Sequence, residues 1–391
     1  MISIAEAKKI ISSQQYHRET EEVRLEELKA GNVLAEDIIS PVDLPLFSNS
    51  MMDGYVVSSD ATSHEVIGEI QAGDVKDYEL PDGKAYRIFT GARIPDNSLA
   101  VIMQESASRE GNQVSFTEDI TAGKNIRKTG DEVTKGAKVL SAGTTITPGL
   151  TGFLAKMGLT HCKVFRKPRI ALLTTGDECK PVGSTLQPGE IYESNSLMLQ
   201  QALADYGYEV LIRHTMDTYE ATRSNLSDLL EQADVLFVTG GISVGDYDFV
   251  GRCLKDLGVT ELFYKVSQKP GKPLFFGRKD NTSVLGLPGN PASSLTCFYQ
   301  YGLPICRNMS GYRPEEFFLP PVQMKLAIDY TKFGPRPEFV RSEYQHDGTV
   351  IPLGKQRSSM LHSYATANCL LYIPEGKQVL TAGQWVTGYL I

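Results

Sequence analysis

A regular alternation of strand-like and helix-like segments begins near residue 169 and limits the fold more than any other feature. Three apolar, strand-like segments follow one another: RIALLTT (169–175), EVLIRHTM (209–216) and DVLFVTG (234–240). The segments between them, NSLMLQQALADYG (195–207) and YEATRSNLSDLLEQ (219–232), repeat apolar residues at i, i+3, i+4 and i+7, as amphipathic helices do. The order β-α-β-α-β predicts a parallel sheet covered by helices on both faces, with ligands bound at the carboxyl ends of the strands.

The segments on either side of this α/β region follow other patterns. Residues 1–40 and 141–168 contain helix-like stretches, the first with an acidic face that we expect to be exposed, and together they predict a helical domain in two parts. Residues 41–140 and 316–391 consist of short β-like runs broken by turn residues. The predicted domains are therefore 1–40 with 141–168, 41–140, 169–315 and 316–391.

The composition argues against several classes of function. The net charge of -8 over 391 residues disfavours a nucleic-acid partner. The longest uncharged run, 139–155, contains Gly, Thr and Pro throughout, so we expect no membrane span. The N-terminal segment is too acidic for an export signal, and the six cysteines form no C-x-x-C pair. A reducing cytoplasm fits these features best.

The third strand-like segment ends in the glycine-rich stretch TGGISVGDYD (239–248). Backbone N–H groups of Gly240, Gly241 and Gly245 can form an anion site at the start of the helix expected near Asp248, and the Ser243 hydroxyl can add a further donor. The stretch matches neither the G-x-G-x-x-G dinucleotide pattern nor the P-loop. It therefore predicts a phosphate site of another kind.

Carboxylates follow several strands of the predicted sheet. Glu178 lies in TTGDE after the first strand, Asp217 follows the second, and Asp248 ends the glycine-rich stretch. Hard oxygen ligands beside a phosphate site are what Mg²⁺ prefers, so these three residues predict a magnesium site. For Asp217 and Asp248, capping of the following helix is the alternative interpretation.

Three lysines surround a Pro-Gly bend in KVSQKPGKP (265–273). The bend cannot be a regular helix, and the charges of Lys265, Lys269 and Lys272 suit a diphosphate or an oxyanion. A solvated run of lysines is the alternative interpretation.

Two further kinds of turn carry candidate residues. In LPGNPASSL (287–295), Pro288 and Gly289 form a turn before a helix, and Asn290 either caps that helix or contacts a ligand. In the β-rich region, Asp53 of NSMMDGY and Thr90 of TGARIP lie in turns that spacing alone identifies only as hairpin turns.

Eight motifs, taken together and in order, carry a resemblance over essentially the whole chain. They are NSMMDGY, TGARIPDNSLAVIMQE, IRKTGDEVTKG, TTGDE, IYESNS, TGGISVGDYD, KPGKP and LPGNP. The chain resembles the MoeA-type molybdopterin molybdenumtransferases, whose eukaryotic relative is the E domain of gephyrin. The resemblance implies an elongated homodimer with a split helical domain, a β-rich insertion, an α/β domain that binds molybdopterin and a C-terminal β-barrel.

The resemblance also implies an activity and roles for residues. The activity is Mg²⁺-dependent insertion of molybdate into adenylyl-molybdopterin with release of AMP, in molybdenum cofactor biosynthesis, at a site between two subunits. By position, Asp53 and Thr90 would act across the subunit interface, and Lys265 and Lys269 would contact oxyanion and phosphate. The implied acidic cluster is Glu178, Asp217 and Asp248. The implied ligand-facing residues of the last domain are Arg341 and Ser363.

Two alternatives remain open at this point. Molybdopterin adenylyltransferases share the α/β domain, which makes their activity the second candidate and makes such an enzyme a candidate partner. Gephyrin shows that the same architecture also serves as a scaffold, and a fold alone does not prove catalysis. The chain departs from the family pattern at Ser48, Met51, Leu99 and the Asp131–Glu132 pair.

Overall fold

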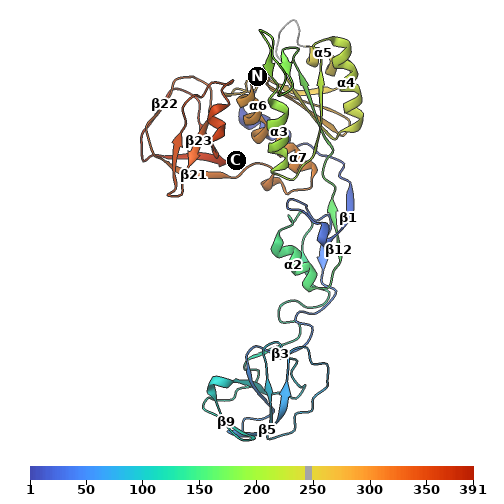
Figure 1. The fold of residues 1–391 in the computed structure, drawn as a ribbon, viewed down its shortest axis with the longest axis vertical. Helices are drawn as coiled ribbons and strands as arrows, with labels where there is room; N and C mark the ends of the chain where they lie inside the picture. The colour runs from blue at the N-terminus through green and yellow to red at the C-terminus, as the bar shows by residue number, and fades with distance from the viewer. Residues whose placement is uncertain (243–248) are drawn as a thin grey trace. The chain divides into compact units, whose positions relative to one another are not determined.

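The computed structural model describes residues 1–242 and 249–391 (Figure 1). The chain forms two compact units. Unit 1 consists of Met1–Ala35, Gly143–Thr151 and His161–Ile391, and unit 2 consists of Glu36–Ala142 and Gly152–Thr160. The four-domain division predicted above is finer than these two units and stays a prediction.

The centre of unit 1 is a six-stranded sheet with the strand order β16-β13-β17-β20-β19-β18. The first four strands pair in parallel, which confirms the predicted parallel sheet, while β19 and β18 complete it as antiparallel strands. In this order the strands are Val210–Thr215, Ile170–Thr175, Val235–Thr239, Thr282–Leu287, Phe275–Lys279 and Thr260–Tyr264.

Helices cover both faces of this sheet, as the sequence predicts (Figure 1). Side chains of β13 alternate between the two faces: Ile170 and Leu172 belong to one core cluster, Ala171 and Leu173 to the other. Both predicted helices bury the expected apolar stripe. The first core includes α3 (Asn195–Ala204), α6 (Pro291–Cys297) and α7 (Leu303–Met309), the last two joined by a π-helix (Phe298–Gly302); the second includes α4 (Tyr219–Gln232) and α5 (Phe249–Asp256).

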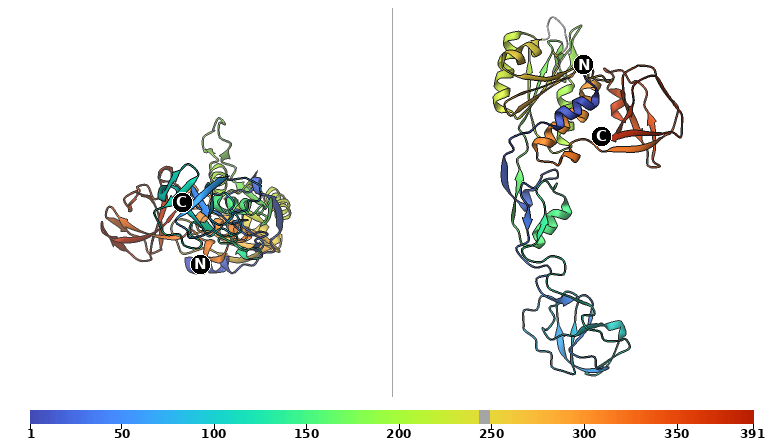
Figure 2. Two further views of the ribbon diagram at one scale, coloured as in Figure 1. Left: turned by 90° about the horizontal axis from the view of Figure 1, so that it is seen from below. Right: turned by 180° about the vertical axis from the view of Figure 1, so that it is seen from behind.

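The N-terminal segment differs from the prediction of helix over residues 1–40. Helix α1 (Ile4–Ser12) packs on the first core beside α7, as Figure 2 shows, but Thr20–Arg24 forms strand β1 and pairs with β12 (His161–Phe165). Glu21 and Glu22 lie on this exposed strand, where Glu22 faces Lys163, whereas Glu26 and Glu27 lie in the short 3-10 helix Leu25–Glu27. The prediction is wrong after Ser12 because exposed acids without a buried stripe do not distinguish a helix from a strand. Helix α2 (Pro148–Lys156) follows in the second part of the predicted split domain.

Unit 2 is rich in β-structure, as predicted for the insertion. Its main sheet has the order β7-β4-β6-β5-β9-β8, and short ladders join β10 to β3 and β11 to β2. The main strands in this order are Ala100–Met103, Gly54–Val57, Lys84–Ile88, Ser63–Ile70, Gln113–Phe116 and Ala107–Glu110; the ladder strands are Ile126–Arg127, Asn49–Ser50, Lys138–Leu140 and Ile38–Ile39.

The C-terminal residues of unit 1 form the predicted barrel, closed in the order β21-β24-β23-β25-β27. A smaller ladder joins β22 to β26. Among the described helices, none has the length and apolar content needed to span a lipid bilayer. The barrel strands in order are Pro321–Leu326, Thr349–Pro352, Glu338–Tyr344, Cys369–Ile373 and Trp385–Leu390, and the ladder strands are Tyr330–Lys332 and Gln378–Leu380.

Gly54 provides a test of the sheet of unit 2. A Cβ atom at this position would overlap the backbone carbonyl of Ile102 on the neighbouring strand β7. We expect Gly54→Ala to destabilise unit 2 by about 3 kcal/mol, because a backbone atom cannot move aside as a flexible side chain can. Thermal unfolding followed by circular dichroism measures the change. Gly68→Ala, in an exposed position of the same sheet where the nearest atom belongs to the Tyr86 ring, is the control and should cost less than about 1 kcal/mol; equal losses would contradict this account.

Candidate functional site

A pocket of about 650 Å³ lies at the edge of the central sheet where the parallel strands end. Loops after β13, β16, β17 and β20 meet there because parallel strands direct their carboxyl ends to the same edge. The pocket is lined by the sequence-predicted residues Glu178, Asp217, Gly240, Gly241, Pro288, Gly289 and Asn290, and further by residues that include Thr175, Tyr192, Asn195 and Ser359.

Two carboxylates of the predicted acidic cluster line this pocket together. Asp217 and its neighbour Asp177 are joined by reciprocal bonds: the Asp217 N–H donates to Asp177 Oδ1 at 3.1 Å, and the Asp177 N–H donates to Asp217 Oδ2 at 3.3 Å. Partial burial raises the pKa of Asp217, and the charges of Asp177 and Glu178 raise it further. A cation would relieve this crowding of acids. Glu178 and Asp217, which line the pocket, therefore fit a hard divalent ion.

The third predicted ligand, Asp248, lies outside the described residues. Among residues 1–242 and 249–391, no group of three histidine, cysteine or acidic side chains is arranged to hold a metal ion. Glu178 and Asp217 line the pocket in the described part of the chain, and the magnesium site stays a prediction.

The glycine loops allow a close approach of the backbone. Gly240 has a φ of 90°, a conformation that favours glycine, and a Cβ atom there would lie 2.6 Å from Thr175 Oγ1. A Cβ atom at Gly289 would lie 3.6 Å from the Cα of Gly240, so the loops after β17 and β20 face each other. Ser243 and Gly245, predicted to belong to the anion site, lie outside the described residues.

Asn195 joins these two loops and carries no role in the sequence analysis. Its Nδ2 donates to Thr239 Oγ1 and to the Gly289 carbonyl, both at 2.8 Å. Its Oδ1 is buried and has no hydrogen-bond partner among the described residues. The motif IYESNS indicated this region, but no local pattern shows that one amide at the start of α3 reaches the ends of two strands.

The segment KVSQKPGKP follows β18, which runs in the same direction as β20 because each pairs antiparallel with β19, so the segment begins at the predicted edge of the sheet and its Pro273 lines the pocket. The described residues that line the pocket do not include Lys265, Lys269 or Lys272. The Lys265 ammonium lies 4.6 Å from the centre of the Tyr264 ring. The Lys269 backbone instead pairs with the barrel: its N–H donates to the Pro337 carbonyl at 2.9 Å, and its carbonyl accepts from the Phe339 N–H at 2.8 Å. Ligand contact by the lysines stays a prediction.

Arg341 lies on β23, the strand to which Lys269 is joined, and it is completely buried. Its Nε donates to Ser363 Oγ at 2.6 Å, and Nη2 donates to the carbonyls of Lys355 and Arg357. Nη1 is buried without a hydrogen-bond partner in the part of the chain that the structure describes. Burial lowers the pKa of Arg341, and its Cζ lies 5.6 Å from the centre of the Tyr364 ring, so the guanidinium is held by neutral groups; contact with an anion stays a prediction. The structure thus brings the predicted pair Arg341 and Ser363 together.

Unit 2 brings the predicted pair Asp53 and Thr90 together. The N–H and the Oγ1 of Thr90 both donate to Asp53 Oδ1 at 2.7 Å. The backbone bond first, and the hydroxyl bond second, lower the pKa of Asp53, so this exposed carboxylate is ionised at neutral pH. The neighbouring side chains of Phe47, Met51 and Met52 are exposed apolar groups.

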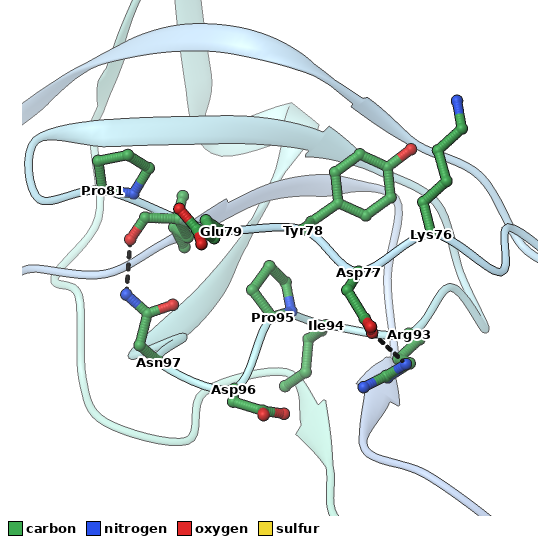
Figure 3. A pocket seen from close by; sticks show the side chains of 11 residues that line it. Lys76, Asp77, Tyr78, Glu79, Pro81, Arg93, Ile94, Pro95, Asp96 and Asn97 are labelled. Atoms are coloured by element: carbon green, nitrogen blue, oxygen red, sulfur yellow. Dashed lines mark hydrogen bonds and ion pairs between the residues drawn. The ribbon is translucent and has the colours of Figure 1, made fainter.

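Another pocket, of about 560 Å³, lies in unit 2 and is not lined by Asp53 or Thr90. It lies between residues 76–81 and 93–97, as Figure 3 shows. Arg93 pairs with Asp77 at 2.9 Å, and Asn97 donates to the Leu80 carbonyl at 2.6 Å, so polar groups that line this pocket satisfy one another (Figure 3). We therefore place the candidate site at the sheet edge of unit 1.

The fold and this pocket define an α/β protein whose strand-end pocket is lined by glycine loops and carboxylates, with β-rich regions attached. Sequence models of three regions match the chain: the MoeA N-terminal region (domains I and II) at residues 2–158, a probable molybdopterin binding domain at 171–308, and the MoeA C-terminal region (domain IV) at 323–391. The chain belongs to the MoeA family, which confirms the resemblance.

Individual relatives match over almost the full length. A protein of Haemophilus influenzae named molybdopterin molybdenumtransferase is 34% identical over 399 residues, covering 99% of this chain and 98% of the relative. Molybdopterin molybdenumtransferase 2 of Mycobacterium tuberculosis is 35% identical, covering 90% and 91%. The crystal structure of the molybdopterin biosynthesis MoeA protein from Pyrococcus horikoshii OT3 has a TM-score of 0.86 at 29% identity and covers 100% of both chains. These matches and the closed C-terminal barrel confirm the predicted combination of α/β and β regions, and the homodimer stays a prediction.

The raised pKa of Asp217 leads to a prediction about stability. Because the folded protein holds the proton more tightly than the unfolded chain, this carboxylate favours folding at low pH, and that contribution is lost as the pH rises from about 3.8 through its folded pKa. At pH 7 we expect Asp217→Asn to raise the free energy of unfolding by about 0.5 kcal/mol, a small gain because the side chain is only partly buried.

Urea unfolding at pH 7 measures this change. The control is Asp228→Asn, which removes an exposed carboxylate that pairs with Arg213 at 3.5 Å and should give no gain. A loss of stability in Asp217→Asn would show that the crowding of Asp217 with Asp177 and Glu178 does not destabilise the protein.

Proposed function

We propose that this chain is a molybdopterin molybdenumtransferase, an enzyme of molybdenum cofactor biosynthesis that inserts molybdate into adenylyl-molybdopterin and releases AMP. One observation carries the proposal: in a chain that matches the MoeA family over all three regions, two carboxylates and two facing glycine loops line one pocket at the sheet edge. Such a pocket suits a phosphorylated ligand whose charge is partly balanced by a cation.

Within this proposal, the pocket binds the pterin diphosphate. The backbone at Gly240 and Gly241 approaches the phosphates, and Asn290 lies beside them at the start of α6. Glu178 and Asp217 would hold Mg²⁺, with Asp248 as a further ligand. When bound, this ion polarises phosphoryl oxygens and neutralises charge that develops as the phosphoanhydride breaks.

The molybdate site is proposed at the junction with the barrel. Arg341 and Ser363 lie in hydrogen-bond contact there, and Arg341 Nη1 has no hydrogen-bond partner among the described residues; because the side chain is completely buried, an oxyanion would reach it only after the covering residues move. The backbone of Lys269 forms hydrogen bonds along β23, the strand that carries Arg341. Lys265 and Lys272 flank Lys269 in sequence. Positive groups that are already held in place bind an oxyanion without the cost of reorganising them.

We further propose that the enzyme works as a homodimer, in which Asp53 of the partner subunit and Thr90 of the partner subunit complete the site. Exposed apolar side chains support this: Phe47, Met51 and Met52 lie near Asp53 in sequence, and a second set lies in or near segments that line the pocket. A second copy of the chain would cover both sets. The second set is Val182, Ile191, Tyr192, Leu197 and Met216.

The two alternatives have less support. The molybdopterin adenylyltransferase activity is tied to the α/β domain alone, whereas this chain also matches the N-terminal and C-terminal MoeA regions. A pure scaffold would not need Glu178 and Asp217 crowded in a pocket, because that crowding costs stability. We propose an adenylyltransferase as the partner that supplies the substrate, and the cytoplasm as the location, which fits six cysteines that are all free thiols.

Release of AMP tests the proposed activity. We expect the purified protein to release AMP from adenylyl-molybdopterin when both molybdate and Mg²⁺ are present. Asp53→Ala and Glu178→Ala should each lower the rate by about 100-fold or more, because each removes a charged group from the site, while circular dichroism and the oligomeric state stay unchanged.

Asp228→Ala, on the exposed face of α4, is the control and should keep full activity. If the unaltered protein releases no AMP, the proposed function is wrong. Transfer of AMP from ATP to molybdopterin would instead support the adenylyltransferase.

A further inference from the structure

Lys269 forms an ion pair with Glu338, and the two side chains are buried to very different extents. Lys269 Nζ lies 3.0 Å from Glu338 Oε1; 46% of the lysine side chain is exposed, but only 5% of the glutamate side chain. The other glutamate oxygen accepts a bond from the Tyr330 hydroxyl at 3.4 Å. The carboxylate is therefore fixed inside the barrel junction, while the ammonium group reaches the surface.

The position of Lys269 does not depend on this ion pair alone. Its backbone is paired with β23 on both sides, as described above. The preceding Gln268 is completely buried, donates to the Gly271 carbonyl at 3.3 Å and accepts a bond from the Tyr301 hydroxyl. Removing the charge of Glu338 should therefore leave the segment in place.

Other cations lie near this carboxylate. Lys332, which is 1% exposed, donates to the carbonyls of Gly334 and Gly376. Burial lowers the pKa of Lys332, Glu338 raises it and Lys269 lowers it, so all three charges interact. Arg341 follows Glu338 on the same strand. An anion held by the exposed Lys269 would therefore lie close to one fixed negative charge, while the two further cations, Lys332 and Arg341, are buried behind it.

We propose that Glu338 is a positioning residue that weakens the oxyanion site: it orients the Lys269 ammonium and offsets part of its charge, so that molybdate is passed on rather than retained. This inference rests on the proposed function, which places molybdate near Lys269 and Arg341. An ammonium group has three N–H donors, and Glu338 uses one, which leaves two for an oxyanion. The Glu338 carboxylate repels that oxyanion, and its burial leaves little solvent to screen the repulsion.

The decisive variant is Glu338→Gln, because glutamine keeps an acceptor oxygen for Lys269 and removes only the charge. Isothermal titration of the full chain with sodium molybdate should give a Kd about fivefold lower than that of the unaltered protein, or lower still. In the AMP-release assay, the KM for molybdate should fall while kcat does not rise, since tighter binding before the reaction does not speed the reaction.

Two variants serve as controls. Glu343→Gln makes the same change in net charge on the same strand, away from Lys269, and should leave the Kd within about twofold. Glu338→Asp keeps the charge and should restore a Kd near that of the unaltered protein. If Glu338→Gln does not fold, Glu338→Met removes the charge at similar volume and is measured in its place.

An equal or higher Kd in the charge-free variant overturns the inference. If AMP is released normally and the Kd does not fall, this inference fails and the proposed function stands. If the unaltered protein neither binds molybdate nor releases AMP, the proposed function fails and this inference fails with it.

Discussion

The parallel pairing of β13, β17 and β20 is the constraint on which the site depends. It directs three loops to one edge of the sheet, where Gly240 and Gly289 face each other and Glu178 lines the same pocket. The Asn195 amide bridges the ends of β17 and β20, so the spacing of the glycine loops is set by buried hydrogen bonds as well as by the strands. A pocket fixed in this way can hold phosphate with the backbone and a cation with carboxylates.

A second constraint joins the α/β domain to the barrel. The backbone of Lys269 extends the pairing of β23, the strand that carries Glu338 and Arg341. Two candidate anion-binding residues from distant parts of the sequence are thereby attached to the same strand. The buried Arg341 has Ser363, backbone carbonyls and the Tyr364 ring as partners and no ion pair among the described residues, which is costly for the fold.

Local patterns in the sequence predicted those features that local physics controls. Apolar spacing gave the parallel sheet and helices α3 and α4, and the glycines after β17 indicated the ligand edge. The sequence predicts a helix beyond Ser12, whereas Glu21 and Glu22 lie in β1, because their cross-strand partners in β12 lie far away in the sequence. The Asn195 bridge and the Lys269–Glu338 pair join residues 94 and 69 positions apart, and no local pattern contains such contacts. Only the family resemblance singled out Asp53, Arg341 and Ser363.

We propose that one catalytic site uses Glu178 of one subunit together with Asp53 of the partner subunit. The most direct test is complementation: Asp53→Ala and Glu178→Ala chains are co-expressed, purified together and assayed for AMP release. Random pairing gives heterodimers as half of all dimers, each with one intact site, so the account predicts about a quarter of the unaltered activity from two chains that are inactive alone. If the mixture is as inactive as its components, the site is not shared between subunits and the account is contradicted.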